Sequence, residues 1–212
     1  MTGSPRVVVR GEAVAEVPPD AAELVVTVEV RDRRRDRAVA RLAEREHELT
    51  ALLDQHRGAL GTVSTEAVSV FPEFDGTRVT GSIATTTTRV PLTDVAAAGE
   101  LAVAVAGLAD TALSGPHWRL SRDHPAHQQV RIDAVADAVT RARAYAGALG
   151  CRLRGLVEVR DAGARSGGPA PVAFSLAASA PSLDLQPAPP QVRGAVEVTF
   201  TMSEPDQEVY QR

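Results

Sequence analysis

Residues 63–90 read VSTEAVSVFPEFDGTRVTGSIATTTTRV, and this stretch decides the fold because it holds two strand patterns joined by a turn. Alternating valines predict a strand over 63–74, and the Thr-rich second half predicts a long return strand over 78–90. Between them lies Asp75-Gly76, the strongest short hairpin signal, since type I′ turns need positive φ at both central residues. The sequence therefore predicts an antiparallel hairpin.

Segments with a helical period flank this hairpin on both sides. Residues 36–57 repeat leucines among Arg and Glu, and Gly58 suits the position just after a helix. Residues 93–108 begin with Thr93-Asp94, a typical N-cap. The two apolar stripes consist of Val39, Leu42, Leu49, Leu52 and Leu53 in the first helix and Val95, Leu101, Val105 and Leu108 in the second.

Further strand patterns precede and follow these helices. Apolar residues alternate with charged ones over 7–17 and again over 24–30, on either side of the turn Pro18-Pro19-Asp20. We expect these two strands to pair antiparallel, and as an alternative the first strand joins the last strands of the chain. A short strand is predicted over 117–121.

The C-terminal part predicts one long helix and two more strands. The helix spans about Pro125 to Leu149, with Gly150 at the C′ position and Asp137 and Arg141 as an i,i+4 pair. Strands follow over 153–160 and 192–202, and the Gly, Pro, Ala and Ser-rich residues 163–191 predict a long flexible loop with a short strand near Ala173–Leu176. The apolar face predicted for the helix is Ile132, Val135, Val139, Ala142, Ala146 and Leu149. The last strand opens with Val192-Arg193-Gly194, which repeats Val9-Arg10-Gly11 of the first strand.

The predicted order of elements is ββαββαβαββ, which indicates an α+β protein with antiparallel sheets packed against helices. Its second to seventh elements spell β-α-β-β-α-β, the ferredoxin-like split unit, which predicts a subdomain over residues 21–123. Residues 1–20 and 124–212 are expected to form a second, smaller, discontinuous subdomain that carries the flexible loop 163–191.

Composition excludes several classes of function. All 23 basic residues of the 212 are arginine, which rules out catalysis by a Schiff-base or P-loop lysine. A net charge of -4 argues against nucleic-acid binding, and 3% aromatic residues leave little for stacking bases. The sequence contains no run of about 18 apolar residues, so it predicts no membrane-spanning helix. No signal-peptide pattern precedes the first strand, and we therefore expect a cytoplasmic protein.

Four polar residues lie close together in sequence: His117, Asp123, His124 and His127. The two last histidines are three apart near a helix start, a spacing that could hold a metal. The alternative, which we prefer, is a set of surface residues in a loop and a helix cap, because no fourth ligand or zinc motif is present. We therefore predict no metal, no cofactor and no catalytic residue.

Two further features have both a functional and a structural interpretation. Cys151, the single cysteine, follows a helix C-terminus, which does not favour a reactive thiolate, so we expect a buried, inert thiol. The run Arg31, Arg33, Arg34, Arg35 and Arg37 could bind an anion or an acidic partner, but interleaved Asp32 and Asp36 favour a solvated surface. The loop from Gly163 to Pro169 matches no phosphate-binding fingerprint.

Several segments resemble the SIMPL-domain family, catalogued as a domain of unknown function, over about residues 6–203. The chain departs from the family pattern by lacking a leader, by Ser82 after Gly81, and by Ser114-Gly115-Pro116-His117 where Gly-Ala-Asn is usual. The resemblance is carried by Gly11, Pro19-Asp20-Ala21, the segment Thr65 to Phe74 with Phe71-Pro72-Glu73-Phe74, and Arg131, Ala134, Ala138, Arg143-Ala144, Ala146, Leu149 and Gly150.

The resemblance implies an α+β fold, assembly into ring-like oligomers in some bacterial members, and a link to oxidative stress in envelope proteins, with no catalytic residue to carry over. We therefore expect a non-enzymatic scaffold or stress-related protein that forms homo-oligomers. The alternative is a small-molecule or metal-binding module whose site lies between the two subdomains, with residues 117–127 at its rim. A hydrolytic enzyme ranks third, because no nucleophile–base constellation is present.

Overall fold

The computed structural model describes residues 4–163, 165–167, 183 and 185–206, which form two compact units. One unit, called here the central unit, consists of residues 19–121 together with 183 and 185–188. The other, the terminal unit, combines the described residues of the N-terminus (4–18), of 122–167 and of 189–206. The terminal unit is therefore interrupted in sequence by the whole of the central unit.

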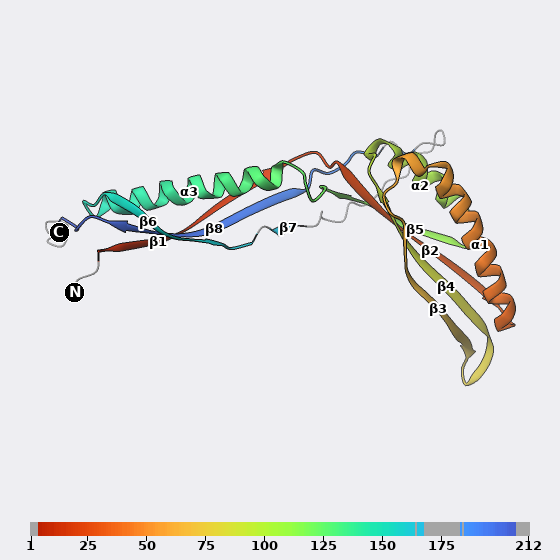
Figure 1. Ribbon diagram of the computed structural model, residues 1–212. Coiled ribbons are helices and arrows are strands. Elements are labelled where there is room, and N and C mark those ends of the chain that lie inside the picture. The colour runs from red at the N-terminus through yellow and green to blue at the C-terminus, as the bar shows by residue number, and fades with distance from the viewer. Residues whose placement is uncertain (1–3, 164, 168–182, 184, 207–212) are drawn as a thin grey trace. The chain divides into compact units, whose positions relative to one another are not determined.

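The observed order of elements agrees with the predicted α+β class and adds one short strand, β7 (Figure 1). Two short 3₁₀ turns, η1 and η2, accompany the helices. The elements are β1 (Arg6–Glu16), β2 (Ala21–Asp32), α1 (Arg35–Gln55), η1 (Arg57–Ala59), β3 (Ser64–Asp75), β4 (Arg78–Leu92), η2 (Val95–Ala97), α2 (Ala98–Ala106), β5 (Thr111–Arg119), α3 (Ala126–Ala148), β6 (Leu153–Asp161), β7 (Arg165–Gly167) and β8 (Gln191–Met202).

The central unit is an antiparallel sheet in the order β3-β4-β2-β5. The predicted hairpin is present: Asp75 pairs with Arg78, and Gly76 takes a φ of 59°. Helix α1 packs on β2 and β4, and α2 packs on β5 and β2. At the start of η2 the carboxylate of Asp94 accepts a hydrogen bond from the N–H of Ala96 at 2.9 Å, as its predicted N-cap role requires.

Large aliphatic side chains fill the core of the central unit, and Trp118 packs with them. Each fully buried Leu or Val contributes roughly 1.5–3 kcal/mol by removing apolar surface from water. Val39 of the predicted α1 stripe is instead exposed, and Ala38 takes its place in the core. The most deeply buried side chains are Leu24, Val26, Val28, Val30, Leu49, Val90, Leu92, Leu101 and Val105.

The terminal unit is a second antiparallel sheet in the order β1-β8-β6, with β7 also paired to β8. Strand β1 pairs with β8 along its whole length, from Arg6 opposite Thr201 to Glu16 opposite Gln191. The expected pairing of β1 with β2 is therefore wrong, and the alternative is correct. Proline holds φ negative, so Pro18-Pro19 cannot provide the tight turn with positive φ that a two-residue hairpin needs.

Helix α3 lies on β1 and β8 through small residues, not through the large apolar residues predicted from the sequence (Figure 1). A Cβ added to Gly11 would lie 2.0 Å from the carbonyl oxygen of Ala134, and one added to Gly194 would lie 2.5 Å from that of Val130. Ile132 and Val135 are 53% and 42% exposed. The buried face consists of Ala126, Val130, Ala134, Ala138, Ala142 and Ala146.

Two strand predictions differ from the structure in their extent. Strand β5 begins at Thr111, well before the predicted 117–121, and its pairing with β2 shifts register between Glu23 and Val25 because Gly115 and Pro116 interrupt the strand. In the predicted loop 163–191, β7 is a strand, and the strand predicted near Ala173–Leu176 lies outside the described residues. The ferredoxin-like subdivision stays a prediction.

Among the described helices, none combines the length and the apolar character needed to cross a membrane.

Candidate functional site

The clearest candidate surface of the terminal unit follows from how closely α3 approaches its sheet. A helix is about 10 Å wide and strands lie about 4.8 Å apart, so one helix covers about two strands. Helix α3 lies over β1 and β8 and makes few contacts with β6. The side of β6 that faces the helix layer is therefore left open, next to the flank of α3.

Apolar side chains line this opening, which we call the α3–β6 groove. Leu156 and Val159 on β6 are 61% and 50% exposed, and they pair with Phe200 and Val198 of β8. Val198 packs against the alanines of α3, and directly paired residues share a face of the sheet, so Leu156 and Val159 lie on the helix side. Val139 supplies the flank of α3.

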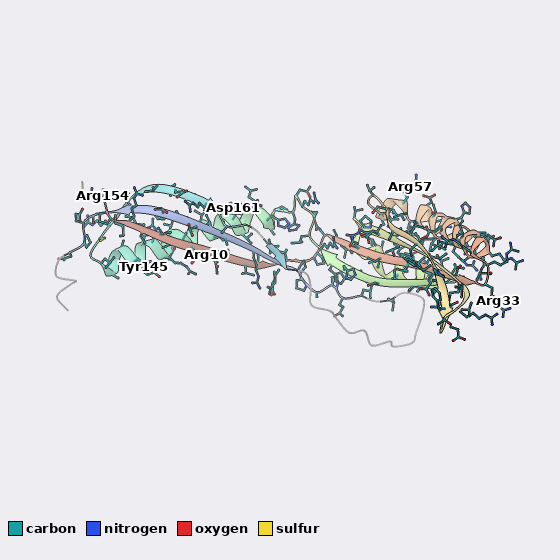
Figure 2. All side chains as sticks on the ribbon, turned by 90° about the horizontal axis from the view of Figure 1, so that it is seen from below. Arg10, Arg33, Arg57, Tyr145, Arg154 and Asp161 are labelled. Carbon is teal, nitrogen blue, oxygen red and sulfur yellow. The ribbon has the colours of Figure 1, made fainter. Side chains whose placement is uncertain are left out.

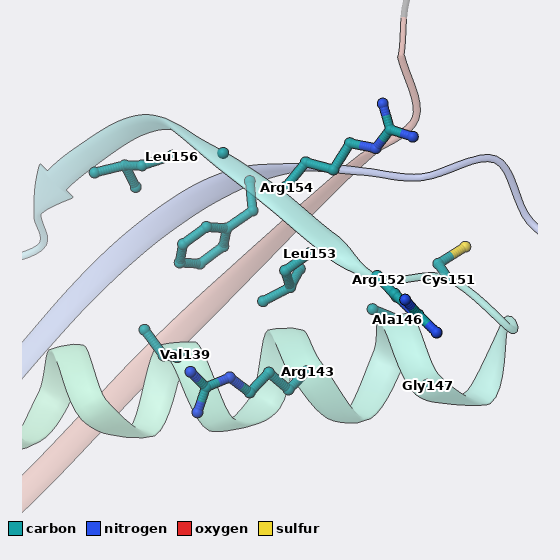
Figure 3. Close-up of a pocket in the computed structure, with 11 residues that line it drawn as sticks. Val139, Arg143, Ala146, Gly147, Cys151, Arg152, Leu153, Arg154 and Leu156 are labelled. Atoms are coloured by element: carbon teal, nitrogen blue, oxygen red, sulfur yellow. The ribbon is translucent and has the colours of Figure 1, made fainter.

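The end of the groove near the C-terminus of α3 widens into a hollow of about 470 Å³ (Figure 3). Arg143 on the flank of α3, Arg152 just after the helix and Arg154 of β6 all border it. Arg154 projects from the side of β6 that faces away from α3 (Figure 3). Leu153, Leu156 and Phe200 form its apolar part.

Positive charge at this hollow is not neutralised within the described part of the chain, where none of the guanidinium groups of Arg143, Arg152 and Arg154 forms an ion pair. Guanidinium groups bind carboxylates or phosphates through two parallel hydrogen bonds. The arrangement suits a ligand or a partner segment that is both apolar and acidic.

Cys151 borders the same hollow, but it is a buried side chain, only 7% exposed. Its thiol lies 3.6 Å from the carbonyl oxygen of Leu149, and it packs with Ala146 and Met202. Gly150 takes the predicted C′ position with a φ of 66°, and the N–H of Cys151 returns to the carbonyl of Ala146 at 2.7 Å. The structure therefore agrees with the prediction that this thiol is buried.

The histidines singled out from the sequence are engaged in local contacts. In β5, the Nε2 atom of His117 lies 3.5 Å from the hydroxyl of Ser114. In the terminal unit, the Nδ1 atom of His124 accepts a hydrogen bond from the N–H of Ala126 at 3.1 Å, at the first turn of α3. Over residues 4–163, 165–167, 183 and 185–206, no three His, Cys, Asp or Glu residues are placed to hold a metal ion.

The arginine run lies at the end of β2 and the start of α1, with Arg33 in the connection between them (Figure 2). Arg31 pairs with Glu29 at 3.0 Å and with Glu73 at 3.4 Å. Arg34 pairs with Asp36, and its guanidinium lowers the pKa of that carboxyl. Two of the five arginines of this run, Arg31 and Arg34, are thus neutralised by neighbours in the same unit.

Strand β3 presents a second exposed surface. It is an edge strand of the central sheet, and Val68, Phe71 and Phe74 are 67%, 64% and 58% exposed. The strand carries three acidic residues (Glu66, Glu73 and Asp75) and no basic one. We call this the β3 edge.

Neither surface was predicted as a site. Two features of the sequence could have indicated the groove: alanines at i, i+4 spacing along α3, and the repeated Val-Arg-Gly of β1 and β8. Together they indicate a helix that lies close to β1 and β8 and therefore leaves β6 uncovered. The loop from Gly163 to Pro169 lies only partly within the described residues, where the N–H of Gly163 binds the Asp161 carboxylate at 2.8 Å.

Comparison with known protein families identifies the family of the chain. The SIMPL family model, described as a protein of unknown function (DUF541), matches residues 7–200. No curated protein matches the chain. The match spans nearly all of both units, so the chain belongs to the SIMPL (DUF541) family.

Proposed function

We propose that this SIMPL-family chain is a non-enzymatic, self-assembling scaffold in which the β3 edge of one copy docks into the α3–β6 groove of the next. The observation that carries the proposal is that one chain exposes two surfaces of complementary character. One is apolar and carries arginines that have no ion-pair partner among the described residues, and the other carries exposed aromatic side chains and the carboxylate of Asp75. Glu66 and Glu73 of the same strand already pair with Arg89 and Arg31.

The groove supplies the features of a docking site. Leu156 and Val159 expose large apolar side chains beside the unpaired edge of β6, to which another strand can add through backbone hydrogen bonds. Arg143 and Arg152 border the groove without ion-pair partners in the described residues. Charged groups of this kind select an oppositely charged partner and set its register.

The β3 edge supplies the features of an occupant. Phe71 and Phe74 are aromatic anchors of the sort enriched at the centres of protein interfaces. Asp75, at the end of the strand, provides a carboxylate for an arginine of the next copy. Val68, Phe71 and Phe74 expose large apolar side chains along one edge strand, which favours a partner over solvent.

Docking of one surface onto a different surface of the next copy has a geometric consequence. Such a heterologous contact repeats from copy to copy, and it produces a closed ring if the rotation closes or an open filament if it does not. Two copies that each docked a β3 edge into the other's groove would close as a dimer, so the proposed assembly, in which each copy docks onto a different neighbour, contains at least three copies.

Light scattering coupled to size-exclusion chromatography tests the proposal at micromolar concentration. We expect a mass that is a multiple of at least three of the 22.3 kDa chain. Leu156→Arg, which places a charge in the groove, is expected to reduce the mass to that of one chain, and so is Phe74→Arg on the β3 edge.

A matched control uses the opposite face of the same terminal sheet. Val8 on β1 is 60% exposed and alternates with residues that face α3, so Val8→Arg adds an equal charge away from the groove. This variant should keep the full mass. A wild-type mass of one chain contradicts self-assembly, and a loss of mass in Val8→Arg equal to that in Leu156→Arg contradicts the use of the groove.

The stress-related role and the cytoplasmic location stay predictions. Sensitivity of a deletion strain to peroxide, and fractionation of cells that carry the tagged chain, test them separately.

A further inference from the structure

A second hollow lies in the central unit, between α1 and the start of β3, and it is separate from the proposed assembly surfaces. Its volume is about 270 Å³. Helix α1 packs on β2 and β4 and reaches β3 only weakly, so a space remains beside the helix. Leu49 and Leu53 of α1 form one wall, and Leu60 and Val63 form the end.

Two polar atoms in this hollow are buried without a partner, and they are the only such side-chain atoms in the described part of the chain. They are Oε1 of Glu46 on α1 and Oγ1 of Thr88 on β4. Thr88 is only 4% exposed and pairs across the sheet with Thr65, which also lines the hollow. A buried polar atom without a hydrogen bond costs about 1–3 kcal/mol, so a pair of them in residues that line one hollow points to a ligand that satisfies both.

Other polar groups around the hollow already have partners. The hydroxyl of Thr50 donates to the carbonyl oxygen of Glu46 at 2.8 Å. Arg57 and Asp54 pair with each other at 2.8 Å, so this arginine does not neutralise Glu46. Burial without a nearby cation raises the pKa of the Glu46 carboxyl.

We propose that this hollow binds a small primary ammonium compound with a short apolar chain. The ammonium group donates to Oε1 of Glu46 and to Oγ1 of Thr88, which are covered in the free protein and must turn toward the hollow. The alkyl chain of the ligand lies against Leu49, Leu53 and Leu60. An ammonium group has three donors and no acceptor, which matches two oxygen acceptors and one remaining bond to water. Its charge also neutralises the one lining carboxylate that has no cation.

The inference goes beyond the proposed assembly and does not depend on it. The hollow is lined by α1, the start of β3 and the end of β4. The assembly uses the α3–β6 groove and the part of β3 that carries Phe71 and Phe74. Failure of the assembly would appear as a mass of one chain, and failure of the ligand site would leave the mass unchanged.

Titration of the full-length chain with n-pentylammonium tests the site. The chain contains one tryptophan, Trp118, which is 5% exposed in the core of the central unit, so its fluorescence reports the melting of that unit. We expect saturable binding by calorimetry with a Kd on the order of a millimolar, and a melting temperature that rises with ligand concentration. 1-Pentanol and pentanoate, which have the same chain with a neutral or an anionic head, should bind at least tenfold more weakly.

Two variants with matched controls locate the ligand. Glu46→Gln should weaken pentylammonium binding at least tenfold, whereas Glu44→Gln, an exposed change of the same charge on α1, should leave it unchanged. Thr88→Val, of equal size, should weaken binding several-fold. Thr86→Val changes the other buried threonine of β4, which does not border the hollow, and should have no effect on binding.

The outcomes are decisive in either direction. Equal binding of pentanol and pentylammonium, an unchanged Kd in Glu46→Gln, or no saturable binding overturns the proposal and leaves a crevice filled by water only. If Glu46→Gln fails to fold, the preference of the wild-type chain among the three pentyl compounds decides.

Discussion

The two units of this chain achieve burial in opposite ways. The central unit packs Leu and Val side chains between two helices and its sheet, with Leu24, Leu49 and Leu101 fully buried. The terminal unit has one helix, and its buried face is a row of alanines against Gly11 and Gly194. Packing in the central unit depends on the volume of its side chains. Packing in the terminal unit depends on the close approach of the α3 backbone to the backbones of β1 and β8.

This difference determines which surfaces remain open. The two helices of the central unit pack mainly on β2, β4 and β5, and three large exposed apolar residues, Val68, Phe71 and Phe74, lie on the edge strand β3. A single close helix leaves the helix side of β6 uncovered in the terminal unit. Each unit therefore offers a surface at the place where its helices do not reach.

The largest effect is expected when a core side chain of the central unit is shortened. Leu24→Ala removes a side chain with no exposed surface and leaves a cavity that the sheet cannot fill, so we expect a loss of about 4 kcal/mol in unfolding free energy. Denaturation followed by Trp118 fluorescence measures it. Retention of wild-type stability would show that this core does not depend on side-chain volume.

The next effect is expected when the helix–sheet contact of the terminal unit is enlarged. Gly11→Ala would place a Cβ 2.0 Å from the Ala134 carbonyl oxygen, so α3 must move away, at a cost of about 3 kcal/mol. Hydrogen exchange should show faster exchange in α3, while the Trp118 transition stays unchanged. A shift in both units would contradict the division into independent cores.

A smaller change in unfolding free energy, this time stabilising, is expected from a substitution in the helix of the terminal unit. Gly147 lies in α3, and a Cβ there would meet nothing within 4 Å. Gly147→Ala should therefore stabilise the helix by about 1 kcal/mol, because alanine has the higher helix propensity. Slower hydrogen exchange of the last turns of α3 is the readout, and faster exchange would mean that the position is more crowded than the structure indicates.

The smallest effect concerns the buried carboxyl of the central unit. Burial raises the pKa of Glu46 in the folded state, so the folded chain binds this proton more tightly than the unfolded chain does. The associated stability is present at low pH and is lost as pH rises through the folded-state pKa. Glu46→Gln should thus melt about 1–2 °C higher than the wild type at pH near 7, with no gain below about pH 4.

Asp54 and Arg57 also border this site and pair with each other at 2.8 Å. A stabilisation by Glu46→Gln that is the same at both pH values would contradict a role for the carboxyl charge.

Local patterns in the sequence predicted much of the fold. The Asp75-Gly76 turn, the alternation of β8 and the Asp137–Arg141 pair, which measures 2.8 Å, all appear as expected. Asp137 also accepts a hydrogen bond from the N–H of Glu12, a contact across 125 residues that no local pattern indicates. The long-range pairing of the first strand with the last was predicted only as an alternative.

The face of α3 shows why the prediction failed there. The predicted face included Ile132 and Val135, which the structure leaves exposed, and Ala142 and Ala146, which it buries. Apart from Val130, the buried residues of the helix are all alanines, because Gly11 and Gly194 bring the facing strands close to the helix backbone. The groove and the Thr88–Glu46 hollow could not be predicted for the same reason: each is defined by what a helix fails to cover.

The pairing of β1 with β8 has a consequence for synthesis of the chain. Arg6 and its partner Thr201 are almost the full length of the chain apart, whereas all the helices and strands of the central unit lie within residues 19–121. At about 5–20 residues per second, β1 waits roughly ten to forty seconds on the ribosome before β8 is made. We expect the central unit to fold first, while β1 stays unpaired and available to chaperones, so the terminal unit is the slower and more aggregation-prone half of the protein.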